Sequence, residues 1–186
     1  MTRQRVMNEP LAIRNAYAQV GVETFYREHG ASYRNPHEDA IQTLLREIVP
    51  AWELDLGRVL DLACGSGEAT LVLRALGAGE IVGADPYTGD AFAARTGLPA
   101  WPVSFEQIAA GALDGEAFSL VVCSFALHLC EPSRLPRLCF ALAQISSALL
   151  ILTPHKRPEL HSAWGWELAR ATVQERVRAR LYERNL

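Results

Sequence analysis

The chain has 186 residues, of which 49% are hydrophobic and 21% charged, and its formal net charge is −3 at pH 7. This length and this apolar share predict one soluble globular domain, and they exclude a disordered or a collagen-like chain. The slight excess of acidic residues gives no general electrostatic support for nonspecific binding to nucleic acid.

The sequence carries no pattern typical of export or membrane insertion. Its longest apolar runs, such as residues 146–152, are far shorter than the roughly 20 residues of a membrane helix. Residues 1–10 lack the apolar stretch of a signal peptide. The four cysteines contain no C-x-x-C pair, and free thiols are usual in a reducing compartment. We therefore expect a cytoplasmic protein.

Residues 1–50 are expected to form a helical N-terminal extension. Residues 14–29 and 38–49 both mix polar and apolar residues at helical spacing. Residues 33–37 separate the two helices, because they include Pro36 and the residue before a proline disfavours the α conformation.

Between residues 57 and 154, predicted strands alternate with predicted helices. Short apolar runs bounded by turn residues predict strands at residues 59–63, 81–84, 99–103, 118–124 and 148–153. Helical spacing predicts helices at residues 68–76, 91–95 and 133–144. This alternation over about 95 residues predicts an α/β fold with a doubly wound, mostly parallel sheet that carries helices on both faces.

The C-terminal segment, residues 155–186, has a different pattern. Basic and apolar residues alternate between Arg176 and Leu181, and a period of two favours a half-buried strand. The same residue types are good helix formers, so a helix stays open as the alternative.

The strongest chemical signal is Asp61-Leu62-Ala63-Cys64-Gly65-Ser66-Gly67, between the first predicted strand and the next helix. Glycines let the backbone approach a ligand, and open parallel sheets bind ligands beyond the carboxyl ends of their strands. Asp85 ends the second strand about 20 residues later, where a carboxylate can accept hydrogen bonds from two ribose hydroxyls. The nicotinamide pattern G-x-G-x-x-G is incomplete because Thr70 stands at its third glycine, so a nicotinamide oxidoreductase is disfavoured.

The stretch Leu60-Asp61-Leu62-Ala63-Cys64-Gly65-Ser66-Gly67 resembles the first motif of class I S-adenosylmethionine-dependent methyltransferases. The similarity continues in Gly83-Ala84-Asp85-Pro86, in residues 118–129, and in the apolar strand that ends in Thr153-Pro154. The resemblance implies a Rossmann-like enzyme that uses S-adenosylmethionine. Members of this family usually finish their sheet with two further strands, but only 32 residues follow Pro154. We therefore expect a shortened C-terminal end with one terminal strand.

The resemblance also implies which residues bind the cofactor. The glycines would approach its methionine half, Asp61 would hold the turn or contact the amino group through water, and Asp85 would bind the ribose. Ser104 stands at the adenine position, and Ser104 and Ser119 both replace acids that are frequent in the family. The expected cofactor-binding residues are Asp61, Ala63, Gly65, Gly67, Asp85, Pro86, Ser104, Phe105 and Ser124.

Catalysis of methyl transfer depends mainly on positioning, and a general base is optional. His128, after the fourth strand, is a candidate base, with simple packing as the alternative. His155 is a second catalytic candidate, after the fifth strand and on the same rim of the sheet. Lys156 and Arg157 beside it would attract an anionic acceptor, and a solvated loop is the alternative.

Residues before the first strand often fold over the cofactor in similar methyltransferases. Tyr26, Tyr33 and His37 are therefore candidate substrate-contacting residues, with ordinary packing as the alternative. The spacing of the cysteines and His128 matches no structural zinc pattern, so we expect no metal.

The favoured function is methyl transfer to a small or anionic acceptor. RNA methylation stays open, because Arg176, Arg178, Arg180 and Arg184 would line one face of the C-terminal segment. A catalytically silent methyltransferase-like partner protein also stays open, since two serines stand at frequent acid positions. A homodimer is expected if another subunit covers the exposed terminal strand.

Overall fold

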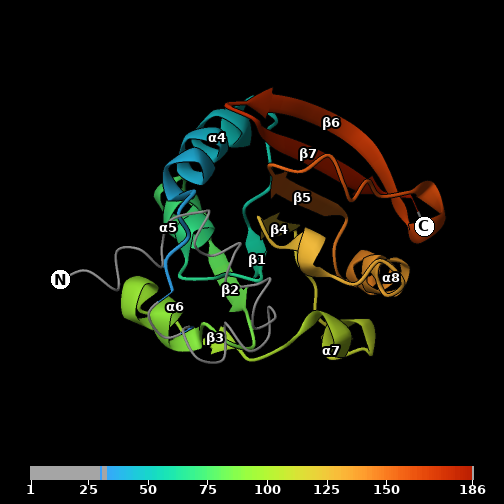
Figure 1. Ribbon diagram of the computed structural model, residues 1–186, viewed down its shortest axis with the longest axis horizontal. Coiled ribbons are helices and arrows are strands. Elements are labelled where there is room, and N and C mark those ends of the chain that lie inside the picture. The colour runs from blue at the N-terminus through green and yellow to red at the C-terminus, as the bar shows by residue number, and fades with distance from the viewer. Residues whose placement is uncertain (1–29, 31–32, 186) are drawn as a thin grey trace, which may run out of the picture.

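Seven strands form one sheet in the computed structural model, which describes residue 30 and residues 33–185 (Figure 1). The strands are β1 (Arg58–Leu62), β2 (Glu80–Ala84), β3 (Ala100–Trp101), β4 (Leu120–Ser124), β5 (Ala148–Thr153), β6 (Trp166–Gln174) and β7 (Val177–Arg184). Their order in the sheet is β3-β2-β1-β4-β5-β7-β6. The first five strands pair in parallel, whereas β7 lies antiparallel between β5 and β6.

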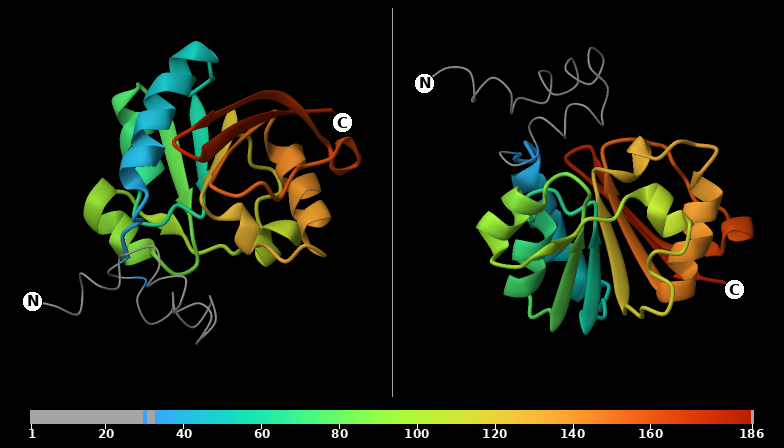
Figure 2. Two further views of the ribbon diagram at one scale, coloured as in Figure 1. Left: turned by 45° about the horizontal axis from the view of Figure 1, so that its top comes forward. Right: turned by 90° about the horizontal axis from the view of Figure 1, so that it is seen from below.

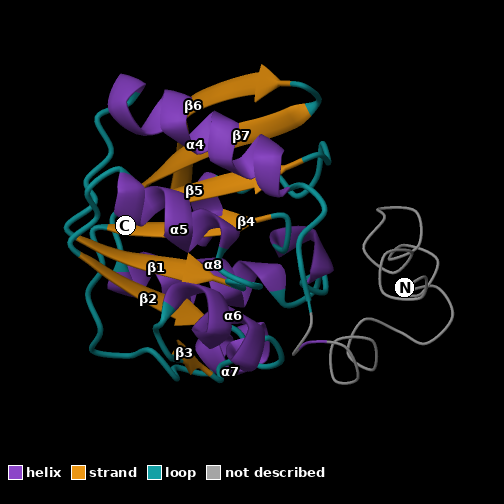
Figure 3. Ribbon diagram, turned by 90° about the vertical axis from the view of Figure 1, so that its left-hand side faces the viewer, coloured by secondary structure: helices purple, strands orange, loops and turns teal. Residues whose placement is uncertain are grey.

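Helices cover both faces of the sheet (Figure 2). One face carries α4 (Glu38–Ala51), α5 (Glu68–Ala75) and α6 (Gly89–Thr96), and the other carries α7 (Phe105–Ala109) and α8 (Leu135–Ile145). Single turns of 3-10 helix, η2 (Leu127–Leu129) and η3 (Ser162–Trp164), follow β4 and precede β6. Because crossover helices connect the parallel strands, the carboxyl ends of these strands lie at one edge of the sheet (Figure 3).

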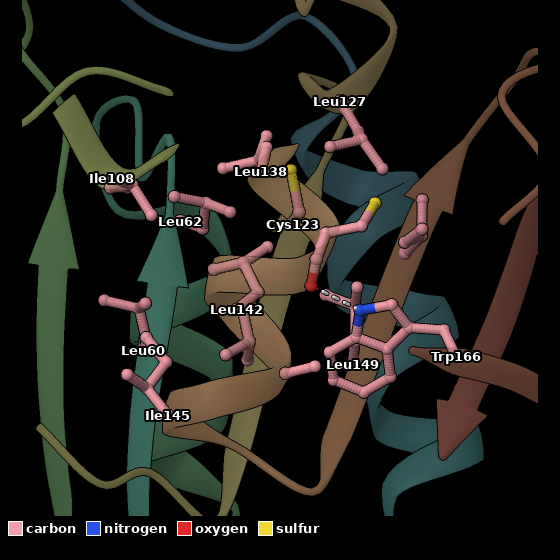
Figure 4. Packing of buried hydrophobic residues seen from close by; sticks show 14 of the residues in the cluster. Leu60, Leu62, Ile108, Cys123, Leu127, Leu138, Leu142, Ile145, Leu149 and Trp166 are labelled. Carbon is pink, nitrogen blue, oxygen red and sulfur yellow. Dashed lines mark hydrogen bonds between the residues drawn. The ribbon is translucent and has the colours of Figure 1, made fainter. Parts of the chain in front are cut away.

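The core has two halves because side chains alternate between the two faces of each strand. In β1, Leu60 packs on the side of α7 and α8, while Val59 packs on the side of α4 and α5. On the α8 side the fully buried Trp166 lies beside Leu149 (Figure 4) and donates a hydrogen bond from Nε1 to the carbonyl of Cys139 at 2.8 Å. Strands buried on both faces explain the nearly continuous apolar runs of the sequence.

The structure confirms the doubly wound, mostly parallel sheet. Each element predicted between residues 38 and 154 is present, with its limits displaced by two residues or fewer. The short helix α7 was not predicted, although Ser104 and Gln107 form a capping box at its start. The predicted helix at residues 14–29 lies outside the described residues.

The prediction of a shortened sheet was wrong. Residues 155–186 supply both β6 and β7, and the alternating stretch from residue 176 is a strand rather than a helix. Most residues of β6 are exposed, so its sequence lacks the apolar alternation of a half-buried strand. Glu175 and Arg176 join the two strands with φ values of 46° and 70°. The sheet ends in the exposed strand β6, and the homodimer stays a prediction.

The apolar segments of the chain serve the core. Within the part of the chain that the structure describes, no helix combines the length and the apolar character that crossing a membrane requires. All four cysteines are buried and free of disulfides. Burial raises the pKa of the Cys130 thiol to about 11 and that of the Cys139 thiol to about 12, so both are protonated at neutral pH.

Candidate active site

A cavity of about 540 Å³ opens at the carboxyl ends of β1, β2 and β4. Its volume lies within the roughly 300–1,000 Å³ typical of small-molecule sites, and this edge of a parallel sheet is the usual place for a ligand. Its wall is formed by five segments: the β1–α5 turn, the end of β2, the start of α7, the end of β4 and the segment before α4. Residues that line it include Tyr33, Asn35, Ala63, Gly65, Glu68, Asp85, Pro86, Ser104, Phe105, Ser124 and Phe125.

The β1–α5 turn contains three residues with a left-handed backbone. Ala63 and Gly65 both have a φ of 55°, and Gly67 has a φ of 89°. A Cβ on Gly65 would lie 3.1 Å from the ring of Tyr33, whereas a Cβ on Gly67 would lie 2.4 Å from Thr96 Cγ2. Gly65 is therefore required at the cavity wall, and Gly67 is required behind it, where α6 packs against the turn.

Asp61 lies fully buried beneath the turn. Its Oδ2 accepts hydrogen bonds from the backbone N–H of Thr70 at 3.1 Å and from the Thr70 hydroxyl at 2.6 Å. Its Oδ1 has no hydrogen-bond partner among the described residues. Burial above all, with the nearby charges of Glu68 and Asp85, raises the pKa of Asp61 to about 7. Asp61 thus holds the start of α5, and its bonds to Thr70 account for a threonine at the third position of the glycine pattern.

Asp85 directly follows β2 and lines the cavity beside Pro86. Its Oδ1 accepts hydrogen bonds from the backbone N–H groups of Tyr87 at 2.8 Å and Thr88 at 3.0 Å. Both bonds use the same oxygen, so Oδ2 is available to accept hydrogen bonds from ligand hydroxyls.

The two serines at frequent acid positions have different surroundings. Ser104 lines the cavity, and its hydroxyl accepts a hydrogen bond from the backbone N–H of Gln107 as the N-cap of α7. Ser119 lies at the opposite end of the sheet, where its hydroxyl accepts from the Arg58 N–H and bonds to the carbonyl of Asp55. The departure at Ser119 therefore concerns the connection before β1 and leaves the cavity unchanged.

Glu68, the first residue of α5, lines the cavity although it is only 2% exposed. Its Oε1 accepts hydrogen bonds from the Ser66 hydroxyl, from the Asn35 N–H at 3.0 Å and from Arg95 Nη1 at 3.3 Å. Arg95 Nη2 also pairs with Glu38 of α4 at 2.5 Å. One guanidinium thus pairs with two carboxylates and joins the start of α5 to the start of α4.

That segment, residues 33–37, lies against the cavity. The ring of Tyr33 covers Gly65, and His37 stacks on Phe125 with ring centroids 4.7 Å apart and an interplanar angle of 19°. Phe125 lines the cavity with a left-handed φ of 57°. Tyr33 and His37 therefore lie where a lid would, whereas Tyr26 lies outside the described residues.

His128 and His155 lie next to each other but are not among the residues that line the cavity. Their ring centroids are 4.4 Å apart. Burial, and then the neighbouring His155, lowers the pKa of His128 to about 4 and also lowers the pKa of His37. The three imidazoles thus form one group in which protonation of one opposes protonation of the next. Among the described residues, no three His, Cys, Asp or Glu side chains are grouped as metal ligands.

The loop after β5 carries His155 together with the exposed Lys156 and Arg157. Arg178 of β7 donates a hydrogen bond to a carbonyl at the start of this loop at 3.1 Å. Arg180, only 7% exposed, donates to the carbonyls of Lys156 at 2.8 Å and Pro158 at 3.1 Å. The arginines of β7 therefore fix the shape of the basic loop.

Sequence reasoning located most of the cavity wall. The expected cofactor-binding residues that line the cavity are Ala63, Gly65, Asp85, Pro86, Ser104, Phe105 and Ser124. Asp61 and Gly67 lie behind the wall. Phe125, which the resemblance places with Ser124 at the end of β4 beside the methyl group, also lines the cavity. Glu68 and Asn35 line it too and were not predicted. An acid in the first turn of a helix is common, so the only available signal for Glu68 was its place directly after the glycine turn.

The residues that line the cavity fit the charges of S-adenosylmethionine. This cofactor carries a sulfonium and an ammonium group, and Glu68, Asp85 and Glu106 line the cavity. Glu106 pairs with Arg134 at 3.2 Å and Glu68 with Arg95 at 3.3 Å, whereas Asp85 forms no ion pair with the described residues. Gly65 lets the ring of Tyr33 and Oε2 of Glu68 come close to the turn, because a Cβ there would lie 3.1 Å and 3.2 Å from them. Fold and site together define a Rossmann-like methyltransferase.

Comparison with known proteins agrees with this class. A family model described as a methyltransferase domain matches residues 59–148. An uncharacterized protein of Schizosaccharomyces pombe is 34% identical, over 97% of this chain and 96% of that protein. Magnesium protoporphyrin IX methyltransferase from Synechocystis, crystallised with S-adenosylmethionine, superposes with a TM-score of 0.61 at 18% identity and covers 94% of this chain and 96% of its own. A TehB-like S-adenosylmethionine-dependent methyltransferase from Corynebacterium glutamicum gives 0.58 at 16% identity, over 94% and 100% of the two chains.

The chain belongs to the class I S-adenosylmethionine-dependent methyltransferases. It is an enzyme of this class, and S-adenosylmethionine is its cofactor.

Proposed function

We propose that this methyltransferase acts on a small anionic acceptor that binds at the carboxyl end of β5. The observation that carries the proposal is a basic rim, in which the imidazoles of His37, His128 and His155 are next to the exposed cations Lys156 and Arg157. The cavity itself is lined by the carboxylates of Glu68 and Asp85, which follow β1 and β2, and of Glu106 in α7. This division of charge suits a cationic cofactor on one side and an anionic acceptor on the other.

His128 is the residue that we assign as the optional general base. With its pKa lowered to about 4, the imidazole is neutral at pH 7 and can accept a proton. An anionic acceptor beside the imidazole favours the protonated form, so acceptor binding would raise this pKa and make His128 a stronger base. When bound, the cofactor supplies an activated methyl group. The contribution of Ser124 and Phe125, at the end of β4, is to position the reactants.

The cofactor site is tested first, by calorimetric titration of S-adenosylhomocysteine into the wild-type protein and an Asp85→Ala variant. We expect micromolar binding that the variant loses, because Asp85 would accept hydrogen bonds from the ribose hydroxyls. A folded wild-type protein that binds no S-adenosylhomocysteine would contradict the proposed function.

The acceptor class is tested by methyl transfer from radiolabelled S-adenosylmethionine to small carboxylic acids and to their neutral amides. We expect turnover of acids only, and a KM that rises about tenfold in a Lys156→Ala/Arg157→Ala variant, since two lost charge pairs at about 0.7 kcal/mol each cost about 1.4 kcal/mol together. Arg137→Ala, which removes an exposed charge from α8, is the matched control. Equal turnover of acids and amides would sink the anionic assignment.

RNA as the acceptor has weaker support. Arg178 and Arg180 donate to carbonyls of the loop after β5, and Arg184 donates to the carbonyl of Ala143 at 3.2 Å. The buried Arg180 is not part of an exposed basic face. Methyl incorporation into RNA, with salt-dependent binding, would replace the small-acceptor proposal.

A further inference from the structure

We propose that Glu68 binds the α-ammonium group of the cofactor's methionine moiety, and that this bond couples cofactor binding to the segment at residues 33–37. The assignment rests on S-adenosylmethionine being the cofactor. It adds an ionic contact at the start of α5 to the backbone contacts expected from the glycine turn.

The two oxygens of Glu68 have different surroundings. The three hydrogen bonds that the described residues donate to Glu68, from Ser66, Asn35 and Arg95, all reach Oε1. Oε2 accepts none of these bonds, and it lies 3.2 Å from the position that a Cβ on Gly65 would occupy, at the cavity wall beside the ring of Tyr33. Oε2 is thus the oxygen directed toward a ligand that passes over the glycine turn.

The other nearby carboxylates are less suited to this role. Asp61 does not line the cavity, and its Oδ2 is held by Thr70. Asp85 lies at the end of β2, where the family resemblance places the ribose. Glu106 is paired with Arg134, at the start of α7. Glu68 is therefore the carboxylate beside the turn that also faces the cavity.

The charge balance around Glu68 favours a further cation. Arg95 is shared between Glu38 at 2.5 Å and Glu68 at 3.3 Å, so two carboxylates face one guanidinium. The negative charge of Glu68 is also among the causes that raise the pKa of Asp61. A buried carboxylate with incomplete compensation is costly, and an ammonium group at Oε2 would remove that cost.

The same carboxylate contacts the segment before α4. The Asn35 N–H donates to Oε1, and the Tyr33 ring lies over Gly65. An ammonium group that fixes Glu68 in this orientation would also strengthen the bond to Asn35. Binding of the methionine moiety is therefore expected to slow hydrogen exchange of the Asn35 amide.

Calorimetry with two ligands tests the assignment. S-adenosylhomocysteine contains the amino-acid moiety, whereas 5′-methylthioadenosine keeps the adenosine and sulfur but lacks it. Glu68→Gln preserves the size of the side chain and an acceptor for Asn35 while it removes the charge. We expect this variant to bind S-adenosylhomocysteine at least about tenfold more weakly and 5′-methylthioadenosine within about twofold of wild type, because one charge-assisted bond is lost. Glu106→Gln, another carboxylate of the cavity wall, should not show this selectivity.

Three results would overturn the assignment: unchanged affinity of Glu68→Gln for S-adenosylhomocysteine, equal weakening for both ligands, or no ligand-dependent change in exchange of the Asn35 amide. Retained binding of 5′-methylthioadenosine shows that the variant is folded. Glu68→Asp, which keeps the charge but withdraws it by one methylene, is expected to lose affinity with the same selectivity and serves if the amide variant does not fold. A wild-type protein that binds neither ligand would instead contradict the cofactor site itself.

Discussion

Asp61 should make the free energy of unfolding decrease as pH rises. Burial raises its pKa from an ordinary 3.8 to about 7 in the folded protein, whereas a carboxyl group in an unfolded chain titrates near 3.9. Between these values the folded state holds a proton that the unfolded state has released, so stability is lost as pH rises through this window. About three pKa units at 1.36 kcal/mol each correspond to about 4 kcal/mol, present below pH 4 and lost above pH 7.

An Asp61→Asn variant isolates this contribution, because its amide oxygen can accept both bonds from Thr70 while the titrating group is gone. The pKa of Asp61 limits the loss to pH values below about 7, so the range from pH 5 to pH 8 contains about two pH units of it. We therefore expect the difference in free energy of unfolding between variant and wild type to shift by about 3 kcal/mol in favour of the variant at pH 8. Urea unfolding of both proteins at several pH values measures it. His128, whose pKa is lowered, gives the opposite trend, but it does so in both proteins and cancels. A stability difference that stays constant across this range would refute the reasoning.

Two further substitutions test the packing around the site. Gly67→Ala should lower the free energy of unfolding by at least about 2 kcal/mol, since a side chain there needs a left-handed φ of 89° and would lie 2.4 Å from Thr96 Cγ2. Gly89→Ala, which meets no atom within 4 Å, should raise it by about 0.5–1 kcal/mol, and equal thermal shifts in the two variants would contradict the argument. Trp166→Phe should cost about 2–4 kcal/mol in urea unfolding, because the buried hydrogen bond to Cys139 is lost and a cavity is left. A loss below 0.5 kcal/mol would show that the indole is replaceable.

The central part of the fold could be predicted from sequence because its constraints are local. Strands such as β1 and β5 are buried on both faces, so they are read as continuous apolar runs. Gly65 and Gly67 mark the turn between β1 and α5, since each has a left-handed φ. Asp85 follows β2 at the distance along the chain that the turn leads one to expect. These signals place most of the cavity wall without information on long-range contacts.

The C-terminal hairpin could not be predicted in the same way. Exposed residues along β6 need no apolar alternation, so the strand gives no signal of its own. The hairpin turn uses Glu175 and Arg176 with φ values of 46° and 70°, positions where glycine or asparagine is expected. The β6 strand exists because β7 pairs with it from Trp166 to Gln174.

The parts of the site that sequence reasoning missed depend on contacts between distant residues. Asn35 and Glu68 are 33 positions apart, and their hydrogen bond is what joins the N-terminal segment to the glycine turn. The stacking of His37 on Phe125 likewise joins residues that no local pattern relates. Periodicity locates residues on an element but does not determine which other element they meet.

The arginines of β7 show how one sequence pattern acquires a different meaning in the folded protein. Their alternation suggested a basic face for RNA, but Arg178 and Arg180 donate to carbonyls of the loop after β5. The cost of burying Arg180 is offset by these bonds, and the result is a fixed loop that presents Lys156 beside the histidines. The C-terminal hairpin, which the sequence analysis did not foresee in full, thus supports the basic rim on which the proposed acceptor specificity depends. A substitution such as Arg180→Met would therefore be expected to alter acceptor KM while the cofactor cavity, on the other side of β4, stays intact.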